Sequence, residues 1–305
     1  MTSYIVRRML HGILVLLVVT FVVFGLMNLG GCPAELMAPD FFSEEDVNRL
    51  RESMGLDEPF LVRYLYFLRN AMRGDMGNSF MLRRPAMPAL MNRVPATLTL
   101  AGLAALLAIV VSVVLGVMSA VHRGTFIDKA ALVFALAGQS IPGFWFGILV
   151  IIIFAVQLRW LPSYGAGTWR HLVLPVFTLS LRYTGLQTRV IRSSMLEVIG
   201  EDYIRTARAK GLSERVILYK HALRNASLPV VTLLGIRLGR LVSGSLIIET
   251  VFAYPGVGWL TIQAIRAMDY PLVLSYILVL AVFILVANLI VDIMYGFLDP
   301  RIAYS

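Results

Sequence analysis

Charged residues are scarce in this sequence of 305 residues: Asp, Glu, Lys and Arg make up only 15%, whereas 58% of the residues are hydrophobic. Soluble domains usually contain about 25% charged residues. The scarcity argues against an ordinary soluble protein, and the mean hydropathy of +0.79 indicates an integral membrane protein. The net charge of +9 is in that setting a signal of membrane topology, so we expect lipid, and no nucleic acid, around the chain.

Cysteine is almost absent, since Cys32 is the only one. An intrachain disulfide is therefore excluded, and helix packing must hold the fold. The run Leu29-Gly30-Gly31-Cys32 is similar to a lipidation site after a signal peptide. The apolar stretch before it, 9–29, is however about as long as a full membrane span of ~20 residues, and Arg7 and Arg8 precede it. We expect a retained anchor that begins on the cytoplasmic side.

Motifs of common catalytic sites are missing as well. The sequence has no HExxH, no GxSxG and no CxxC, and its histidines are far apart: His11, His122, His171 and His221. It also lacks GxxxxGK[ST], so the chain cannot hold ATP in a P-loop by itself. We therefore predict that this chain is not an enzyme, with no catalytic residue, metal site or cofactor of its own. Any use of ATP would need another subunit.

Long apolar stretches dominate what is present. Four stretches without Asp, Glu, Lys or Arg are long enough to cross a bilayer: 9–34, 94–122, 130–158 and 270–291. Two further stretches, 172–191 and 229–249, are apolar but interrupted by arginine. The pattern predicts an all-α integral membrane protein with six transmembrane helices. Pro142 lies inside the third span and predicts a kink or a break there.

The distribution of basic residues predicts the orientation of the spans. With the amino terminus inside, the cytoplasmic segments contain thirteen Lys and Arg residues, and the two short outer loops contain three. Short loops rich in Lys and Arg stay in the cytoplasm. Both termini are therefore predicted to be cytoplasmic. The outer segment before the second span has eight basic residues, but long segments translocate largely regardless of charge.

This outer segment predicts two short amphipathic helices. Ser43 and Asp46 form a capping-box pattern, and Gly55 would end that first helix. Asp57 is expected to cap the second helix, which would end before Gly74. Its predicted apolar stripe consists of Phe60, Tyr64, Leu65, Leu68 and Met72. We expect both helices on the outer face of the bundle, packed on the protein's own spans, with lipid binding as the alternative.

A polar, basic segment with helix-favouring composition, 201–229, separates the fourth and fifth spans. It must lie in water, and its basic side chains, alanines and Gly211 are suited to docking a soluble partner. The basic residues are Arg205, Arg208, Lys210, Arg215, Lys220 and Arg224.

Charges inside the predicted spans are a second candidate site. Arg182 interrupts the fourth span, and Arg237 and Arg240 lie three residues apart on the fifth, which Glu249 ends. A central arginine costs about 2.5–3.5 kcal/mol on insertion scales, so it should face a polar interior. One interpretation is that Arg182, Arg237, Arg240 and Glu249 line a translocation pathway. The other is that the arginines pair with Glu249, Asp292 or a second subunit, or lie near an interface.

Several short motifs occur together along the chain. They are Gly55-Leu56-Asp57-Glu58-Pro59, 74–79 (GDMGNS), Pro95-Ala96-Thr97-Leu98, Glu201-Asp202-Tyr203, 205–211 (RTARAKG), Arg224-Asn225-Ala226, Leu228-Pro229, 249–258 and Asp269-Tyr270-Pro271. As a set they resemble the inner-membrane permease subunits of bacterial ABC importers, in the dipeptide, oligopeptide and nickel branch. The sequence departs from that family at Gly30-Gly31-Cys32-Pro33 and at Met268, where an arginine is common.

The resemblance implies a division into 1–30 (the cytoplasmic end and first span), 31–93 (the extracytoplasmic segment) and 94–305 (the permease core, with a cytoplasmic coupling loop at 192–228). The residues that match the coupling motif are Arg205, Thr206, Ala207, Arg208, Ala209, Lys210 and Gly211. They are expected to form a short helix, near 206–211, that docks on an ATPase.

The implied partners are a homologous second permease, two ATPases that bind ATP and Mg, and an extracytoplasmic solute-binding protein. The implied function is import of di- or oligopeptides by alternating access, in the bacterial inner membrane. Nickel or other metal chelates, glutathione and opines stay open as substrates. A self-sufficient secondary transporter is the alternative of another class, although no clear internal repeat supports it.

Overall fold

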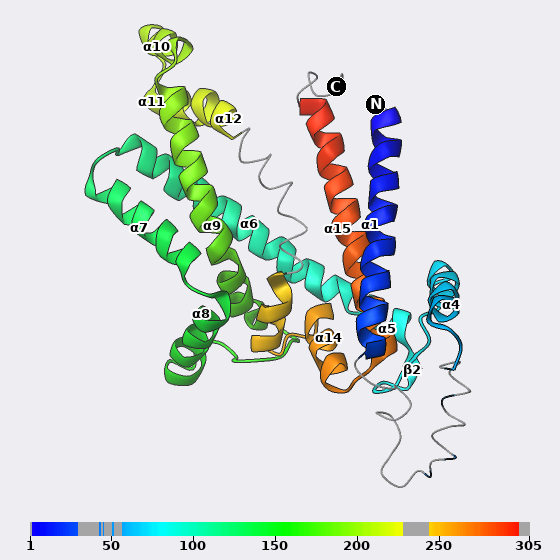
Figure 1. Ribbon diagram of the computed structural model, residues 1–305. Helices are drawn as coiled ribbons and strands as arrows, with labels where there is room; N and C mark the ends of the chain where they lie inside the picture. The colour runs from blue at the N-terminus through cyan, green and yellow to red at the C-terminus, as the bar shows by residue number, and fades with distance from the viewer. Residues whose placement is uncertain are drawn as a thin grey trace. The chain divides into compact units, whose positions relative to one another are not determined.

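The computed structural model describes residues 2–29, 43, 45, 51, 57–227 and 244–298. Almost all regular structure in these ranges is helical (Figure 1). The chain forms two compact units: unit 1 contains Met1–Ala96 and Pro255–Ser305, and unit 2 contains Thr97–Tyr254.

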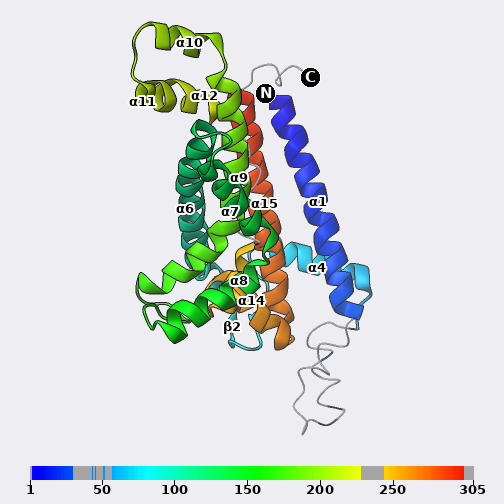
Figure 2. The ribbon, with the colours of Figure 1, turned by 90° about the vertical axis from the view of Figure 1, so that its left-hand side faces the viewer.

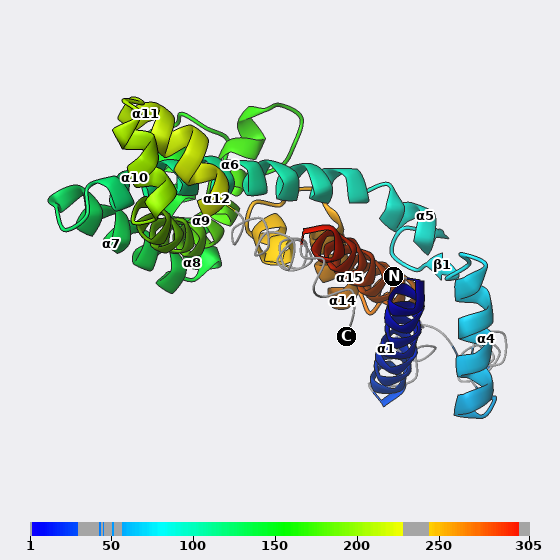
Figure 3. The ribbon, with the colours of Figure 1, turned by 90° about the horizontal axis from the view of Figure 1, so that it is seen from above.

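Unit 1 pairs the first and last long helices. Helix α1 (Thr2–Leu29) packs against α15 (Tyr270–Leu298), and the two run in opposite directions (Figures 1 and 3). The start of α1 and the end of α15 therefore lie at the same end of this pair (Figure 1). Two termini on one side of a membrane require this arrangement.

Helix α4 (Phe60–Met72) lies on α1 (Figure 3). The buried Tyr64 hydroxyl donates to the carbonyl oxygen of Leu17 at 2.9 Å and lies 2.9 Å from the Thr20 hydroxyl oxygen. Edge-on aromatic contacts with Phe21 add to this packing, since the Phe60 and Tyr64 rings are both within reach of it. This amphipathic helix therefore packs on the helix that the sequence predicts as the first span.

Two details of α4 differ from the sequence prediction. Asp57 does not cap the helix; it forms an ion pair with Arg51, at 2.7 Å, and Pro59 occupies the cap position. Leu65 and Met72 are exposed, because the helix turns them away from α1. The predicted end is confirmed, since Gly74 follows α4 with a φ of +74°. The expected helix that begins near Ser43 lies largely outside the described residues, as does Cys32.

A small hairpin and three helices form the apolar core of unit 1. Strand β1 (Asn78–Ser79) pairs with β2 (Arg84–Pro85) in antiparallel register, and α5 (Ala86–Met91) follows directly. Helix α14 (Val257–Arg266) precedes α15. Together these elements bury a cluster of mainly aliphatic side chains: Met76, Ala86, Ala89, Leu90, Val257, Leu260, Ala264 and Leu272.

Close helix packing organises unit 2. Helix α6 (Val94–Val121, in unit 2 from Thr97), α7 (Phe126–Ser140) and α9 (Arg170–Ile199) approach one another at glycines. A Cβ at Gly116 would lie 2.7 Å from Ile191 of α9, and one at Gly138 would lie 3.1 Å from Leu181. Small residues permit such close contact where lipid supplies little hydrophobic drive for helix association. The small-residue content of 94–122 and 130–158 thus places these helices against α9.

The third predicted span is broken rather than merely kinked. α7 ends at Ser140, α8 (Gly143–Val150) begins after Pro142 and continues into the π-helical η1 (Ile151–Gln157), and the two parts meet at 106°. Proline removes a backbone donor and restricts the residue before it to extended conformations, and Ile141 has such a conformation, with φ −77° and ψ 126°. The predicted position of the break is confirmed.

Among the described residues, two helical stretches are long and apolar enough to cross a membrane, Ala86–Val121 and Tyr270–Ala287, and the bent α7–α8 pair could be a third span. The apolar part of α1 that the structure describes, Leu10–Leu26, is shorter. Much of the predicted fifth span lies outside the described residues, which resume as a helix at 244–251. The six-span topology and the cytoplasmic termini stay predictions.

Candidate functional site

The candidate coupling helix is α10 (Asp202–Ala209), which follows α9 after only two residues (Figure 2). Glu201 is extended at the start, and Asp202 in the first turn is favourable toward the helix dipole. The helix expected near 206–211 therefore begins earlier and ends earlier, because its end is fixed by a glycine. Gly211 has a φ of +76°. The amides of Gly211 and Leu212 bond back to the carbonyls of Arg208 and Ala207, at 2.9 and 3.3 Å.

The two faces of α10 differ. On the inner face Ile204 is fully buried and Ala207 is buried, and both belong to an apolar cluster. That cluster joins α6, α9 and α10 to the segment after α10, through Val117, Ala120, Ile191, Met195, Ile217, Ala222 and Ala226. Apart from Ala207, all residues of the predicted coupling motif are exposed: Arg205, Thr206, Arg208, Ala209, Lys210 and Gly211.

The segment after α10 turns back beneath it. It consists of α11 (Glu214–Val216), a π-helical turn η2 (Ile217–Ala222) and α12 (Leu223–Ala226), and η2 contacts both α10 and α9 (Figure 2). The Asn225 side-chain amide donates to the Tyr203 hydroxyl at 2.7 Å. Two motifs that are separated in sequence thus meet here. The segment after α10 therefore supports α10 from its inner side.

One ion pair on this surface shapes the end of α10. Arg208 donates to both carboxylate oxygens of Glu214, at 2.7 and 3.4 Å. This hydrogen bonding lowers the pKa of Glu214 and raises that of Arg208. Because the folded-state pKa of Glu214 is depressed, the pair is formed at neutral pH, and its contribution is lost only as pH falls through that lowered value. Both side chains are partly exposed, so a docking partner can reach them.

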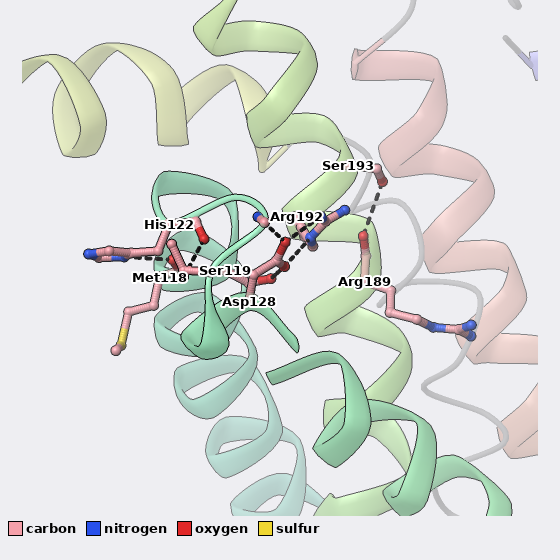
Figure 4. Close-up of polar contacts among 9 residues, drawn as sticks. Met118, Ser119, His122, Asp128, Arg189, Arg192 and Ser193 are labelled. Carbon is pink, nitrogen blue, oxygen red and sulfur yellow. Dashed lines mark hydrogen bonds and ion pairs between the residues drawn. The ribbon is translucent and has the colours of Figure 1, made fainter. Parts of the chain in front are cut away.

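A second ion pair lies near the end of α9 (Figure 4). The buried Asp128, in the first turn of α7, accepts two hydrogen bonds from the Arg192 guanidinium, at 2.7 and 2.8 Å. It also accepts one from the Ser119 hydroxyl, at 2.5 Å, and one from the amide of Gly124, at 2.9 Å. Sequence reasoning missed this pair. The available signal was one acidic residue in a short basic turn between two apolar helices.

Arg182 and Glu249, two of the four predicted pathway residues, occupy different environments in unit 2. Arg182 is exposed on α9. Glu249 is fully buried and accepts hydrogen bonds from the hydroxyls of Thr97, at 2.7 Å, and Ser245, at 3.0 Å. Arg237 and Arg240 lie outside the described residues. The structure therefore describes only two of the four residues, and the role of the set in a pathway stays a prediction.

Two further motifs, 74–79 and Asp269-Tyr270-Pro271, meet in unit 1. The Ser79 hydroxyl of one motif donates to the carboxylate of Asp269, in another, at 2.5 Å, and the amide of Met81 donates to the same oxygen at 3.0 Å. Asp269 is completely buried. The neighbouring Met268, where a family departure was noted, is half exposed with a φ of 52°. In the described part of the chain no group of three or more His, Cys, Asp or Glu side chains could hold a metal ion.

Comparison with known families agrees with this architecture. Residues 112–304 match the family described as the binding-protein-dependent transport system inner membrane component, and residues 1–101 match the N-terminal model for membrane components of such systems. The chain belongs to this family. It is thus an ABC importer permease subunit in the inner membrane, and its family implies ATPase and solute-binding partners.

Full-length relatives resemble this permease. A protein of Brucella abortus (strain 2308), provisionally named a peptide transport system permease protein, is 42% identical over 314 residues, covering 100% of both chains. The glutathione transport system permease protein GsiC of Escherichia coli (strain K12) is 37% identical over 306 residues, again covering 100% of both.

A solved structure shows the same fold at low sequence identity. It is a chain of the inward-facing MetNI methionine ABC transporter, which superposes with a TM-score of 0.55 at 22% identity. The match covers 70% of the permease and 97% of that chain.

Proposed function

We propose that this permease forms half of the translocation pathway of an ATP-driven importer for di- or oligopeptides, together with a homologous second permease. The observation that carries this proposal is α10. One face of this helix is held in an apolar cluster that includes α6 and α9, and the other face is basic and exposed. A helix fixed on one side and free on the other can pass a force from a docked partner to the helices behind it.

Two ATPase subunits would dock on such helices, one on each permease, and would bind ATP and Mg. Closure of the ATPase pair on ATP would displace α10 and, with it, the end of α9. The attached helices would then change from an inward-open to an outward-open arrangement, and hydrolysis would reset them. A solute-binding protein would deliver the substrate to the outer face.

The names of the relatives support peptides as the substrate class. One relative is named for peptides and another for glutathione, which is itself a tripeptide. Nickel chelates and opines are the alternatives that uptake competition would test. Since an importer of this kind receives its solute from a binding protein, the permease need only admit a short peptide, whereas the binding protein selects it.

The coupling role of α10 can be tested by changing Gly211 to Glu. The positive φ of Gly211 is unfavourable for any residue with a Cβ, and Glu would add a negative charge near Arg208, so ATP-driven uptake should be abolished while the complex still reaches the membrane. Gly74→Glu is the matched control. Gly74 has a φ of +74°, no atom lies within 4 Å of a Cβ there, as is true of Gly211, and it follows α4 instead of α10. Undiminished uptake by the Gly211 variant would contradict the proposal.

A further inference from the structure

The Asp128–Arg192 pair joins the α6–α7 turn to the helix that carries α10. Arg192 lies seven residues before α9 ends at Ile199, which is about 10 Å along the axis at 1.5 Å per residue. Asp128 lies 64 positions earlier in the chain. Only two residues, Gly200 and Glu201, separate the end of α9 from α10.

Each oxygen of the Asp128 carboxylate accepts two hydrogen bonds. One oxygen accepts from Ser119 of α6 and from Arg192, and the other accepts from Gly124 of the turn and from Arg192 again. A bidentate arginine–carboxylate pair fixes orientation as well as distance. A single buried side chain therefore ties the end of α6, the turn and the start of α7 to α9.

The apolar packing around the pair also joins α6 to α9 and α10. Val117 and Ala120 of α6 share the buried cluster with Ile191 and Met195 of α9, on either side of Arg192 in the sequence, and with Ile204 of α10. Apolar attraction is non-directional, whereas a bidentate arginine–carboxylate pair fixes both distance and orientation. The Asp128–Arg192 pair thus adds a directional constraint that the apolar cluster does not supply.

We propose that Asp128 and Arg192 are positioning residues for transport: they make the α6–α7 hairpin move with α9 as one body when a partner displaces α10. This inference rests on the proposed function, because it assumes that α10 receives the displacement. Without the pair, α10 and α9 would still move, but α6 and α7 would lag behind. ATP hydrolysis would then continue with little transport.

The test uses the complete complex in lipid vesicles and measures peptide uptake and ATP hydrolysis together. In Asp128→Asn, uptake per ATP hydrolysed should fall about tenfold, a size typical of coupling between sites, while ATP hydrolysis itself changes little. Exchanging the two residues, Asp128→Arg with Arg192→Asp, should restore part of the coupling. Lys129→Gln, which removes an exposed charge from the next position, is the control and should couple normally.

A distance measurement separates this role from simple stabilisation. Spin labels at the exposed positions Arg123 and Ser193, with Cys32 replaced by Ser, report the separation of the turn from α9. It should be the same with and without ATP in the parent complex and should change with ATP in Asp128→Asn. If Asp128→Asn does not assemble, Arg192→Lys serves instead, since a lysine keeps the charge but cannot donate two N–H groups in one plane.

The outcomes distinguish the two proposals. Failure of the unmodified complex to couple ATP to uptake would refute the proposed function itself. A second outcome is that the unmodified complex couples ATP to uptake, and that the Asp128 or Arg192 variant also couples normally with an unchanged distance. This outcome would overturn only the role of the pair. A parallel loss of uptake and hydrolysis with an unchanged distance would also overturn it, since that result indicates a purely structural contact.

Discussion

At the scale of single residues, the packing of unit 2 depends on where a side chain is missing. Gly185 of α9 is buried, and a Cβ there would collide with the backbone carbonyl oxygen of Ala135 in α7. A backbone atom cannot swing aside as the end of a side chain can. The contact between α7 and α9 at this point therefore requires glycine.

We expect Gly185→Ala to lower the stability of the complex by about 1–3 kcal/mol, the usual cost of forcing an extra carbon into a packed interior. The measurement is the melting temperature of the purified complex in detergent. Gly102→Ala is the matched control, because Gly102 is also helical and no atom lies within 4 Å of a Cβ there. The control should melt at or slightly above the parent temperature, since alanine favours a helix. Equal melting temperatures for the two variants would show that α7 can move away freely.

At the scale of elements, buried polar side chains connect segments that are distant in sequence. Ser79 at the end of β1 and Asp269 before α15 are 190 positions apart, and Thr97 of α6 and Glu249 are 152 apart. Each pair buries a carboxylate and supplies it with a hydroxyl donor. A buried charge is tolerated only when its hydrogen bonds are made, so these contacts fix which elements meet.

We predict that Ser79→Ala destabilises unit 1 by about 1–3 kcal/mol, the cost of leaving a buried group short of a partner. The Asp269 carboxylate would keep the amide of Met81 but lose its shortest hydrogen bond. Asn78→Ala, which alters an exposed neighbour on the same strand, is the control. Thermal unfolding of the purified complex measures both. A Ser79 variant as stable as the Asn78 variant would mean that this bond adds nothing to the hairpin's attachment.

The sequence predicted most elements well because their signals are local. Apolar runs predicted the long helices α1, α6 and α15, and Pro142 marked the break after α7, since each signal lies inside the element it defines. The exposed basic face of α10 was likewise predictable. Its bounds were not, because Gly211 acts through a left-handed conformation that ends the helix two residues earlier.

Tertiary contacts were not predictable from local patterns. Asp57 has the spacing of a helix cap, yet it pairs with Arg51, since a salt bridge competes with capping. Asp128 and Arg192 carry no motif, and only the approach of α7 to α9 reveals that they meet. The partner of a charged residue can be identified only when the fold is known, and patterns in a single sequence do not specify which distant residues meet.

At the scale of the whole molecule, the family of this permease implies ATPase and solute-binding partners. The sequence contains no P-loop motif, and α10 presents its basic face outward. A transporter with its own ion coupling would instead need no ATPase at this helix. The two classes therefore differ in what must be added before uptake occurs.

We expect vesicles that contain both permeases and the ATPases to accumulate short peptides only when ATP and the solute-binding protein are both present. Omitting either should reduce uptake to the rate of protein-free vesicles. The ATPases are expected to act at the inner face and the binding protein to deliver the peptide at the outer face, and uptake requires both. Competition by dipeptides, glutathione and nickel complexes should follow their affinities for the binding protein. Accumulation by the permeases alone, driven by an ion gradient, would instead establish a secondary transporter and remove the reason for a docking face on α10.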